Sequence, residues 1–136
     1  MADKDIQLEI ITPTGKVFSG DVDTFIAPGF EGYFGVLQGH APYVVALKIG
    51  EIKLQSDAKL SRFATTGGFA EVLPHKITVL AEAAEPADAI DLERAEKAVS
   101  RAQSRIEEGR KKWDVDRAEL AMARAFNRMA IAKKNI

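Results

Sequence analysis

The sequence contains no cysteine, a single tryptophan and only two histidines among its 136 residues. Without cysteine the chain has no disulfide, no thiolate nucleophile and no cysteine-ligated zinc site. No apolar run approaches the roughly 18 residues that a transmembrane helix needs, and the first residues lack the apolar stretch of a signal peptide. We therefore expect a protein that works in the cytosol or a comparable compartment.

Residues suited to hydrolytic or transfer catalysis are also scarce. His40 and His75 are far apart in the sequence and have no acidic cluster nearby, so neither a catalytic triad nor a histidine-based metal site is predicted. Gly67-Gly68 lacks the glycine and lysine spacing of a phosphate-binding loop and is interpreted as a turn or bulge. The sequence therefore favours a protein that is not an enzyme and needs no metal.

The charged residues are unevenly divided between two parts of the chain. Residues 1–86 carry 7 basic and 11 acidic side chains, a net charge of −4, whereas residues 87–136 carry 12 basic and 9 acidic ones, a net charge of +3. The composition changes at Pro86, which makes a natural hinge. We expect two domains, 1–86 and 87–136, and we expect the second to meet an acidic partner.

Residues 6–80 have apolar side chains that mostly alternate with polar ones. Ile6, Leu8 and Ile10 show this period of two, and turn residues separate them from further short alternations. We predict a strand break at residues 19–21 and a hairpin turn at residues 74–76. About eight to ten strands in this length predict a small sandwich or flattened barrel, since one open sheet would leave an apolar face in water.

Two helices are predicted after residue 87, because apolar and small residues recur there at intervals of three and four. Asp91 is placed to cap the first helix and Gly109 to end it, and Asp114 and Asp116 open the second. The connection is short, so the helices are expected to form an antiparallel hairpin. The two stripes predicted to face each other are Leu92, Ala95, Val99, Ala102 and Ile106, and Val115, Ala118, Met122, Ala125, Met129 and Ala132.

Each predicted helix also carries a row of three arginines with spacings of seven and four. The rows are Arg94, Arg101 and Arg105 in the first helix, and Arg117, Arg124 and Arg128 in the second. Alanine-rich stripes bury little apolar area, so the hairpin is expected to hold itself together weakly. A weak helix pair with two cationic rows is suited to grip an anion and to release it, which suggests a switch.

A more ordinary interpretation of the rows is a solvated face supported by ion pairs at i,i+4 spacing, such as Glu93 with Lys97 and Glu107 with Lys111. The two interpretations stay open for Arg105, Arg110 and Arg117. Another alternative is a non-enzymatic module whose basic helices bind nucleic acid or an acidic partner. Its support is limited, because the stacking aromatics in this part of the chain are Trp113 and Phe126 alone.

Several short motifs follow one another in an order that resembles one protein family. They are Glu31-Gly32, Gly35-Val36-Leu37, Gly39-His40-Ala41-Pro42, Gly67-Gly68-Phe69-Ala70-Glu71-Val72, Ile77-Thr78-Val79-Leu80-Ala81, Ile90-Asp91-Leu92-Glu93-Arg94-Ala95, Arg117-Ala118-Glu119-Leu120-Ala121 and Arg124-Ala125-Phe126-Asn127-Arg128. In this order and spacing the whole chain is similar to the epsilon subunit of bacterial F-type ATP synthases, in the form found in Gram-positive and thermophilic bacteria. Two positions depart from the family's pattern. Tyr33 stands where many relatives carry an acidic or small polar residue, and Gln38 stands where the family usually has proline.

The resemblance implies a ten-stranded β-sandwich followed by an antiparallel two-helix hairpin. In this family the sandwich binds the γ subunit and the membrane rotor ring, or c-ring, and couples rotation to proton flow. The hairpin folds against the sandwich or extends along γ into the catalytic α/β assembly, where it inhibits ATP hydrolysis. Such a chain is a non-catalytic, peripheral part of the synthase on the cytoplasmic face of the cell membrane. The γ or ring contacts implied by resemblance are Glu31, Tyr33 and His40.

Some family members bind ATP on the folded hairpin without hydrolysing it, and this favours the non-inhibitory state. Carried over by resemblance, the ATP contacts are Glu85, Ile90, Asp91, Arg94, Arg101, Arg124 and Arg128. The arginines would then approach the phosphates from both helices and join the helices through a shared anion. ATP is thus expected as a regulatory ligand, without a requirement for a metal.

Overall fold

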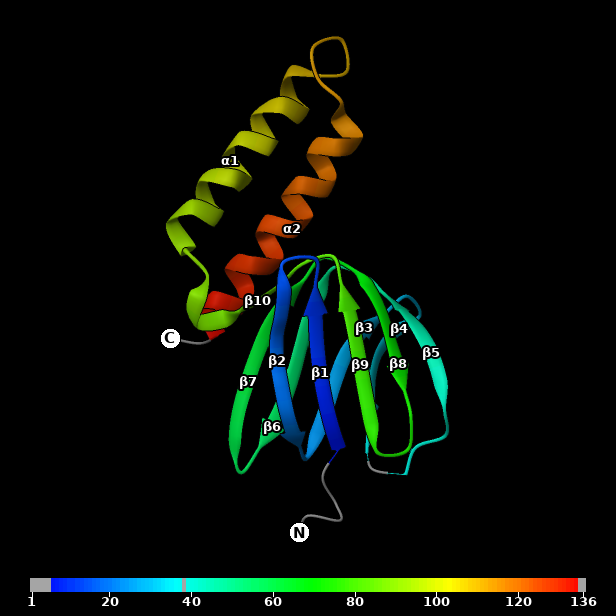
Figure 1. The fold of residues 1–136 in the computed structure, drawn as a ribbon. Coiled ribbons are helices and arrows are strands. Elements are labelled where there is room, and N and C mark those ends of the chain that lie inside the picture. The colour runs from blue at the N-terminus through cyan, green and yellow to red at the C-terminus, as the bar shows by residue number, and fades with distance from the viewer. Residues whose placement is uncertain (1–5, 38, 135–136) are drawn as a thin grey trace. The chain divides into compact units, whose positions relative to one another are not determined.

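The structure, a computed structural model, describes residues 6–37 and 39–134 (Figure 1). Gln38, one of the two departures from the family pattern, lies outside the described residues. The chain divides into two compact units, Met1–Pro86 and Ala87–Ile136. The first unit consists of β-strands, and the second contains two α-helices. The order of strands followed by helices is the one that the periodicities predict.

The first unit is a sandwich of ten strands. They are β1 (Ile6–Thr12), β2 (Gly15–Val22), β3 (Thr24–Gly29), β4 (Gly32–Val36), β5 (Tyr43–Leu47), β6 (Gly50–Ser56), β7 (Lys59–Thr65), β8 (Gly68–Val72), β9 (Lys76–Ala81) and β10 (Ala84–Pro86). Their hydrogen-bonded order is β10-β7-β6-β3-β5-β8-β9-β1-β2, with β4 paired to β3. Figure 1 shows this sheet curling over so that its strands lie in two layers. The predicted β-sandwich is confirmed.

The core of the sandwich lies between the layers and follows the period-two alternation. Ile6, Leu8 and Ile10 are fully buried, whereas the intervening Gln7 is exposed. The same cluster takes in Phe25, Ile52, Leu54, Ile77 and Val79 from β3, β6 and β9. Each such side chain contributes roughly 1.5–3 kcal/mol when it is fully buried. A register slip by one residue would turn these side chains outward, so the core also fixes the strand register.

The strand break predicted at residues 19–21 is wrong. These residues continue β2, because they pair with residues 7–9 of β1, and the chain breaks instead at Asp23. Turn-forming residues here are overridden by the ladder to a neighbouring strand. The hairpin predicted at residues 74–76 is confirmed, since β8 and β9 are antiparallel neighbours and the Leu73 N–H donates to the Lys76 carbonyl at 2.8 Å.

The turn between β6 and β7 holds two residues in an unfavourable backbone conformation. Ser56 pairs with Lys59, so Asp57 and Ala58 are the two central residues of the turn, with φ of 49° and 67°. Two-residue hairpin turns of this kind have positive φ at both positions, and Asp-Gly is among the pairs they favour. Ala58 therefore carries a steric cost that glycine would not have.

We expect Ala58→Gly to raise the free energy of unfolding of the sandwich by about 1 kcal/mol, after allowance for the larger entropy of glycine in the unfolded chain. Urea denaturation followed by far-UV circular dichroism measures the change. Ala41→Gly is a suitable control, because Ala41 is exposed and is not among the described residues with positive φ. An unchanged or lower midpoint for Ala58→Gly would contradict the interpretation.

Candidate anion-binding site

The second unit is a hairpin of α1 (Leu92–Glu108) and α2 (Val115–Lys134), preceded by the short 3-10 helix η2 (Ala87–Ala89). The Asp91 carboxylate accepts a hydrogen bond from the Arg94 backbone N–H at 3.1 Å and caps α1. Asp114 caps α2 in the same way, accepting from the Arg117 N–H at 3.1 Å. Gly109 ends α1 with φ of 89°. The predicted caps are confirmed.

The helices pack through small side chains, as the two stripes predict. Every stripe residue is buried or half-buried, and those in the buried class are Ala95, Ala102, Val115, Ala118, Ala125 and Ala132. An alanine offers a single methyl group, so each of these contacts removes little apolar area from water. The stability of the hairpin is therefore expected to respond strongly to any ligand that binds both helices.

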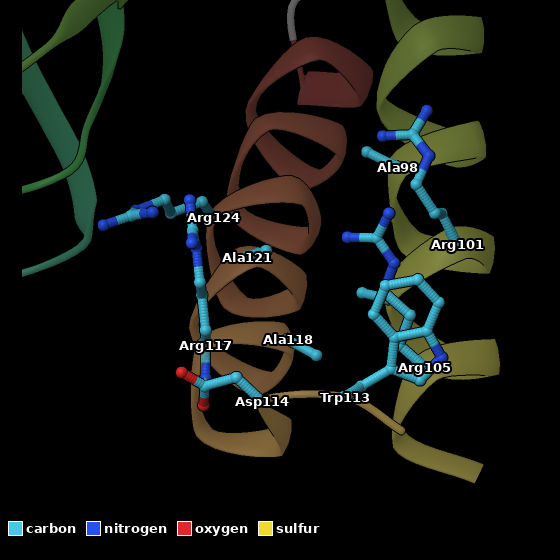
Figure 2. A pocket seen from close by; sticks show the side chains of 10 residues that line it. Ala98, Arg101, Arg105, Trp113, Asp114, Arg117, Ala118, Ala121 and Arg124 are labelled. Carbon is cyan, nitrogen blue, oxygen red and sulfur yellow. The ribbon is translucent and has the colours of Figure 1, made fainter. Parts of the chain in front are cut away.

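The hairpin has a cavity of about 510 Å³, which is lined by residues of both helices and of the connection between them (Figure 2). Its lining is Ala98, Arg101, Ala102, Arg105, Trp113, Asp114, Arg117, Ala118, Ala121 and Arg124. In Figure 2 the side chains of Arg101 and Arg105 extend from α1 toward α2, whereas Arg117 and Arg124 are supplied by α2. Ligand pockets typically measure about 300–1,000 Å³, so the cavity has the size of a small-molecule site.

The four arginines of the cavity form no ion pair with a carboxylate in the part of the chain that the structure describes. Within residues 6–37 and 39–134, no ion pair joins any of them to an aspartate or glutamate, and Arg124 Nε is buried without a hydrogen-bond partner. The one lining carboxylate, Asp114, already caps α2. The four arginines line one cavity, and in Figure 2 the side chains of Arg117 and Arg124 extend on the side of α2 away from α1. Their positive charge is one that an anion would balance.

Other cations of the hairpin do have partners. Lys97 Nζ lies 3.2 Å from Glu93, and Arg110 lies 2.9 Å from Asp116. The Arg110 guanidinium lowers the pKa of the Asp116 carboxyl and Asp116 raises the pKa of Arg110, first through their hydrogen bond. These pairs are solvent-exposed, and such pairs contribute little to stability. The solvated-face interpretation therefore describes Arg110 well.

The connection between the helices holds one of the cavity arginines in place. The Arg105 guanidinium carbon lies 4.4 Å from the centroid of the Trp113 ring, within cation–π distance. The Trp113 Nε1–H donates to Glu108, and Lys112 lies 3.4 Å from Glu108. The Trp113 hydrogen bond, followed by Lys112 and Arg105, lowers the pKa of Glu108. The predicted ion pair of Glu107 with Lys111 is thus replaced by Glu108 with Lys112, one residue further along.

The residues assigned to ATP by resemblance fall into four groups. Arg101 and Arg124 line the cavity, and Arg94 and Arg128 lie on α1 and α2 outside its lining. Ile90 and Asp91 lie between η2 and α1, where the Asp91 carboxylate already accepts its capping hydrogen bond. Glu85 is half-buried in β10 and belongs to the first unit.

Two further cavity residues, Arg105 and Arg117, are ones for which the sequence left two interpretations open. The structure lines the cavity with both, and it adds Trp113 from the connection. The equal spacing of the two arginine rows is the only sequence signal for these arginines. No sequence signal pointed to Trp113 as part of the site.

On the sandwich, the residues assigned to γ or ring contacts are exposed. Glu31 lies in the β3–β4 turn, Tyr33 is 57% exposed in β4, and His40 follows β4. The Tyr33 hydroxyl accepts a hydrogen bond from the Glu51 N–H at 2.9 Å, which ties this turn to β6. Phe30 and Leu37 nearby in the sequence are also exposed. The β3–β4 turn therefore presents both apolar and polar groups to a partner.

A second exposed apolar surface, which the sequence analysis missed, covers neighbouring strands. Val44 on β5, Phe69 on β8 and Leu80 on β9 are each more than half exposed, and Phe69 is paired with Ala46 and Leu80. We call these four residues, Val44, Ala46, Phe69 and Leu80, the outer apolar strip. Exposed contiguous apolar groups of this kind mark contact surfaces. The sequence signal that could have revealed this surface is the presence of apolar residues at strand positions where the alternation predicts exposed side chains.

No group of three or more histidine, cysteine, aspartate or glutamate side chains with the arrangement of a metal site occurs among the described residues. Gly67 and Gly68 join β7 to β8 with positive φ, in accordance with a turn or bulge. No helix in the described part of the chain has the length and apolar character needed to cross a bilayer.

Comparison with known proteins matches both units to one family. Residues 5–87 match the ATP synthase, Delta/Epsilon chain, beta-sandwich domain, and residues 88–133 match the ATP synthase, Delta/Epsilon chain, long alpha-helix domain. The chain belongs to the ATP synthase delta/epsilon family. Its relatives are epsilon chains, stalk subunits of the synthase that are not catalytic, so the expectation of a non-catalytic chain is confirmed.

Relatives within the delta/epsilon family are similar along most of the chain. The ATP synthase epsilon chain of Pelotomaculum thermopropionicum is 51% identical over 106 residues, which cover 78% of this chain and 79% of the relative. The epsilon chain of Syntrophobacter fumaroxidans is 46% identical over 134 residues, covering 98% and 99%. That of Bacillus subtilis is 45% identical over 131 residues, covering 96% and 99%. The resemblance to bacterial epsilon subunits is confirmed.

A solved structure shares the fold. A chain in the Euglena gracilis mitochondrial ATP synthase, OSCP/F1/c-ring in rotational state 1, is similar with a TM-score of 0.82 and 23% identity, over 93% of this chain and 80% of that chain. At this level of identity the likeness supports the fold of the delta/epsilon family rather than any individual contact.

Proposed function

We propose that this chain is a regulatory epsilon subunit in the central stalk of an F-type ATP synthase and that its hairpin senses ATP. The observation that carries the sensor is the cavity lined by four arginines from two helices, none of which forms an ion pair with a carboxylate within residues 6–37 and 39–134. As part of the synthase, the chain is held peripherally on the cytoplasmic face of the membrane. It couples proton flow to ATP synthesis mechanically and performs no hydrolysis itself.

The sandwich supplies the attachment to the stalk. The exposed residues Glu31, Tyr33 and His40, together with the outer apolar strip, give it two surfaces suited to protein contacts. We assign the two surfaces jointly to the binding of the γ subunit and the c-ring. A rigid sandwich is suited to this role, because its core fixes the register of the strands that carry the contact residues.

The hairpin supplies the regulation. Arg101 and Arg124 approach the ATP phosphates from opposite helices, and Arg94 and Arg128 extend the cationic rows on either side. Planar guanidinium groups form paired hydrogen bonds with phosphate, so one triphosphate joins the two helices. Asp91 acts mainly by capping α1 and so positioning Arg94, whereas Ile90 contacts the nucleoside part.

The switch follows from the thin packing of the helices. A ligand at one hundred times its dissociation constant stabilises the form that binds it by roughly 2.7 kcal/mol, which outweighs a weak preference for the open form. With little ATP, the hairpin opens and extends along γ into the α/β assembly, where its arginines meet acidic residues and hydrolysis is inhibited. With abundant ATP, the phosphates occupy the same arginines and inhibition falls.

Isothermal titration of the isolated full chain with ATP tests the sensor. We expect saturable heat with one ATP per chain and no release of phosphate over hours. Arg94→Ala is expected to weaken binding by about tenfold, the loss of one charge-assisted interaction. Absence of heat at millimolar ATP would remove the sensor from the proposal, and turnover of ATP by the isolated chain would contradict a non-catalytic role.

A further inference from the structure

Two of the chain's three methionines lie in the packing between the helices. The sequence has no cysteine, so the methionine thioethers are its sulfur atoms. Met1 lies outside the described residues, whereas Met122 and Met129 both lie on α2. They are seven residues apart, about two turns of the helix, and therefore share one face. That face is the stripe of α2 that packs against α1.

The two methionines are the long side chains in a stripe of small ones. Ala118, Ala125 and Ala132 are buried in the same stripe, and each offers a single methyl group. Methionine has a long, flexible side chain that fills irregular gaps between packed elements. Met122 and Met129 therefore supply a large share of the apolar area that α2 removes from water. Both residues are half-buried, so solvent and small solutes reach them.

A thioether in this position is open to oxidation. Hydrogen peroxide transfers one oxygen atom to the sulfur: the O–O bond breaks, an S–O bond forms, the sulfur is oxidised and the peroxide is reduced to water. The product is a sulfoxide, a polar group with a strong hydrogen-bond acceptor in place of an apolar sulfur. An acceptor buried without a donor destabilises the packing around it, and the alanine methyl groups of the stripe offer no donor.

We propose that Met122 and Met129 form a modification site, at which oxidation by a peroxide to the sulfoxide loosens the packing of the two helices. The inference goes beyond ATP sensing and depends on the helix packing alone, so it is tested without nucleotide. Under the proposed function its effect is opposite to that of ATP, which joins the helices. Sulfoxide reductases, one for each sulfoxide epimer, return the thioether and make the change reversible.

Treatment of the full chain with hydrogen peroxide tests the site. Mass spectrometry locates the added oxygen, and urea denaturation followed by far-UV circular dichroism measures the helices. We expect one added oxygen on each of Met122 and Met129, together with a urea midpoint of the helical signal that is lower by about 1 M. Reduction of the treated chain by the two reductases is expected to restore the midpoint.

The double variant Met122→Leu with Met129→Leu is the control for other oxidation. It keeps apolar side chains of similar volume in the stripe, and it still contains Met1 and Trp113. Its midpoint is expected to be the same before and after peroxide. An equal fall in this variant, or an unchanged midpoint in the oxidised parent chain, would overturn the proposal. So would conditions that oxidise Met1 but leave both helix methionines as thioethers.

Glutamine introduces a polar acceptor at the same positions without peroxide. Met122→Gln and Met129→Gln are each expected to lower the urea midpoint by about 0.5 M or more. Leu120→Gln is the matched control, because Leu120 is 46% exposed on α2 outside the stripe. Glutamine, leucine and methionine have similar helix propensities, so the control midpoint is expected to move by less than about 0.2 M.

The glutamine series decides the matter if the leucine double variant fails to form its helices. A larger loss at Met122 and Met129 than at Leu120 supports the site, since the difference reports the polar group within the packing. Equal losses at all three positions would show that the stripe does not distinguish a polar group from an apolar one, and the proposal would fall.

Discussion

Replacement of Gly68 by alanine is expected to lower the free energy of unfolding of the sandwich by about 4 kcal/mol, as the sum of backbone strain and a steric collision. Gly68 has φ of 132°, which L residues rarely adopt. A Cβ at this position would lie 2.1 Å from the Leu80 carbonyl oxygen and 2.8 Å from Ala81 Cα. Both atoms belong to the β9 backbone, so no side-chain rotation relieves the collision.

Gly15→Ala is the matched control for Gly68→Ala. Gly15 has nearly the same φ, 135°, but no atom lies within 4 Å of its Cβ position. It is expected to show the backbone strain alone, about 1–2 kcal/mol. Urea denaturation followed by far-UV circular dichroism gives both values. Equal losses in the two variants would contradict the collision, because the excess in Gly68→Ala is the quantity that the contact with β9 predicts.

The place of Gly68 in the sheet explains why this loss concerns the whole sandwich. Gly68 is paired with Leu47 of β5 on one side and with Ala81 of β9 on the other. A backbone shift that made room for a methyl group would disturb both ladders. The sequence indicated a turn or bulge at this point, but the close approach of β9 was not visible in it, because Gly68 and Leu80 are 12 residues apart.

Much of the sandwich is predictable from the sequence, because alternation records which face of a strand is buried. Ile6, Leu8 and Ile10 are the clearest case. Pairing between strands leaves no comparable local signal. The continuation of β2 through residues 19–21 depends on its ladder with β1, and the parallel pairing of β1 with β9 joins segments about 70 residues apart. Strand existence was therefore easier to predict than strand ends or neighbours.

The hairpin shows the same division between local and non-local information. Its caps are set by residues within one turn of the helix ends, and Asp91, Asp114 and Gly109 were all identified from the sequence. The spacing of the arginine rows does not tell which guanidinium finds a carboxylate. Arg110 reaches Asp116, whereas Arg105 lies on Trp113 and lines the cavity with Arg117. Those differences depend on the path of the connection.

The two units thus have contrasting designs. The sandwich is held by large, fully buried side chains such as Phe25, and its contact surfaces are carried on a rigid frame. The hairpin packs mostly through alanines, together with Val115 and Ile131, and has a cavity with excess positive charge. Under the proposed function, weak packing and unbalanced charge are both expected to make the closed hairpin depend on an anion. If the proposed function holds, an apolar seam of leucines in place of the alanines is expected to close the hairpin without a ligand and to abolish the proposed response.

Combined replacement of Arg101 and Arg124 by glutamine is expected to abolish ATP binding detectable at millimolar ATP. The two side chains come from opposite helices, line the same cavity and lack carboxylate partners within the described residues. Hydrogen bonds to charged groups contribute about 1.5–3 kcal/mol each. Each single variant is therefore expected to bind about 10- to 100-fold more weakly, and the double variant about 100- to 10,000-fold more weakly.

The double variant Lys111→Gln with Lys133→Gln separates a site effect from a charge effect. It also removes two positive charges, but from exposed residues outside the cavity lining. Its ATP affinity is therefore expected to stay within about threefold of that of the parent chain. Helical circular dichroism of the arginine variants is expected to be retained, because two mutually repelling cations have been removed from one cavity. ATP affinity of the arginine double variant equal to that of the lysine control would show that the two guanidinium groups hold no phosphate.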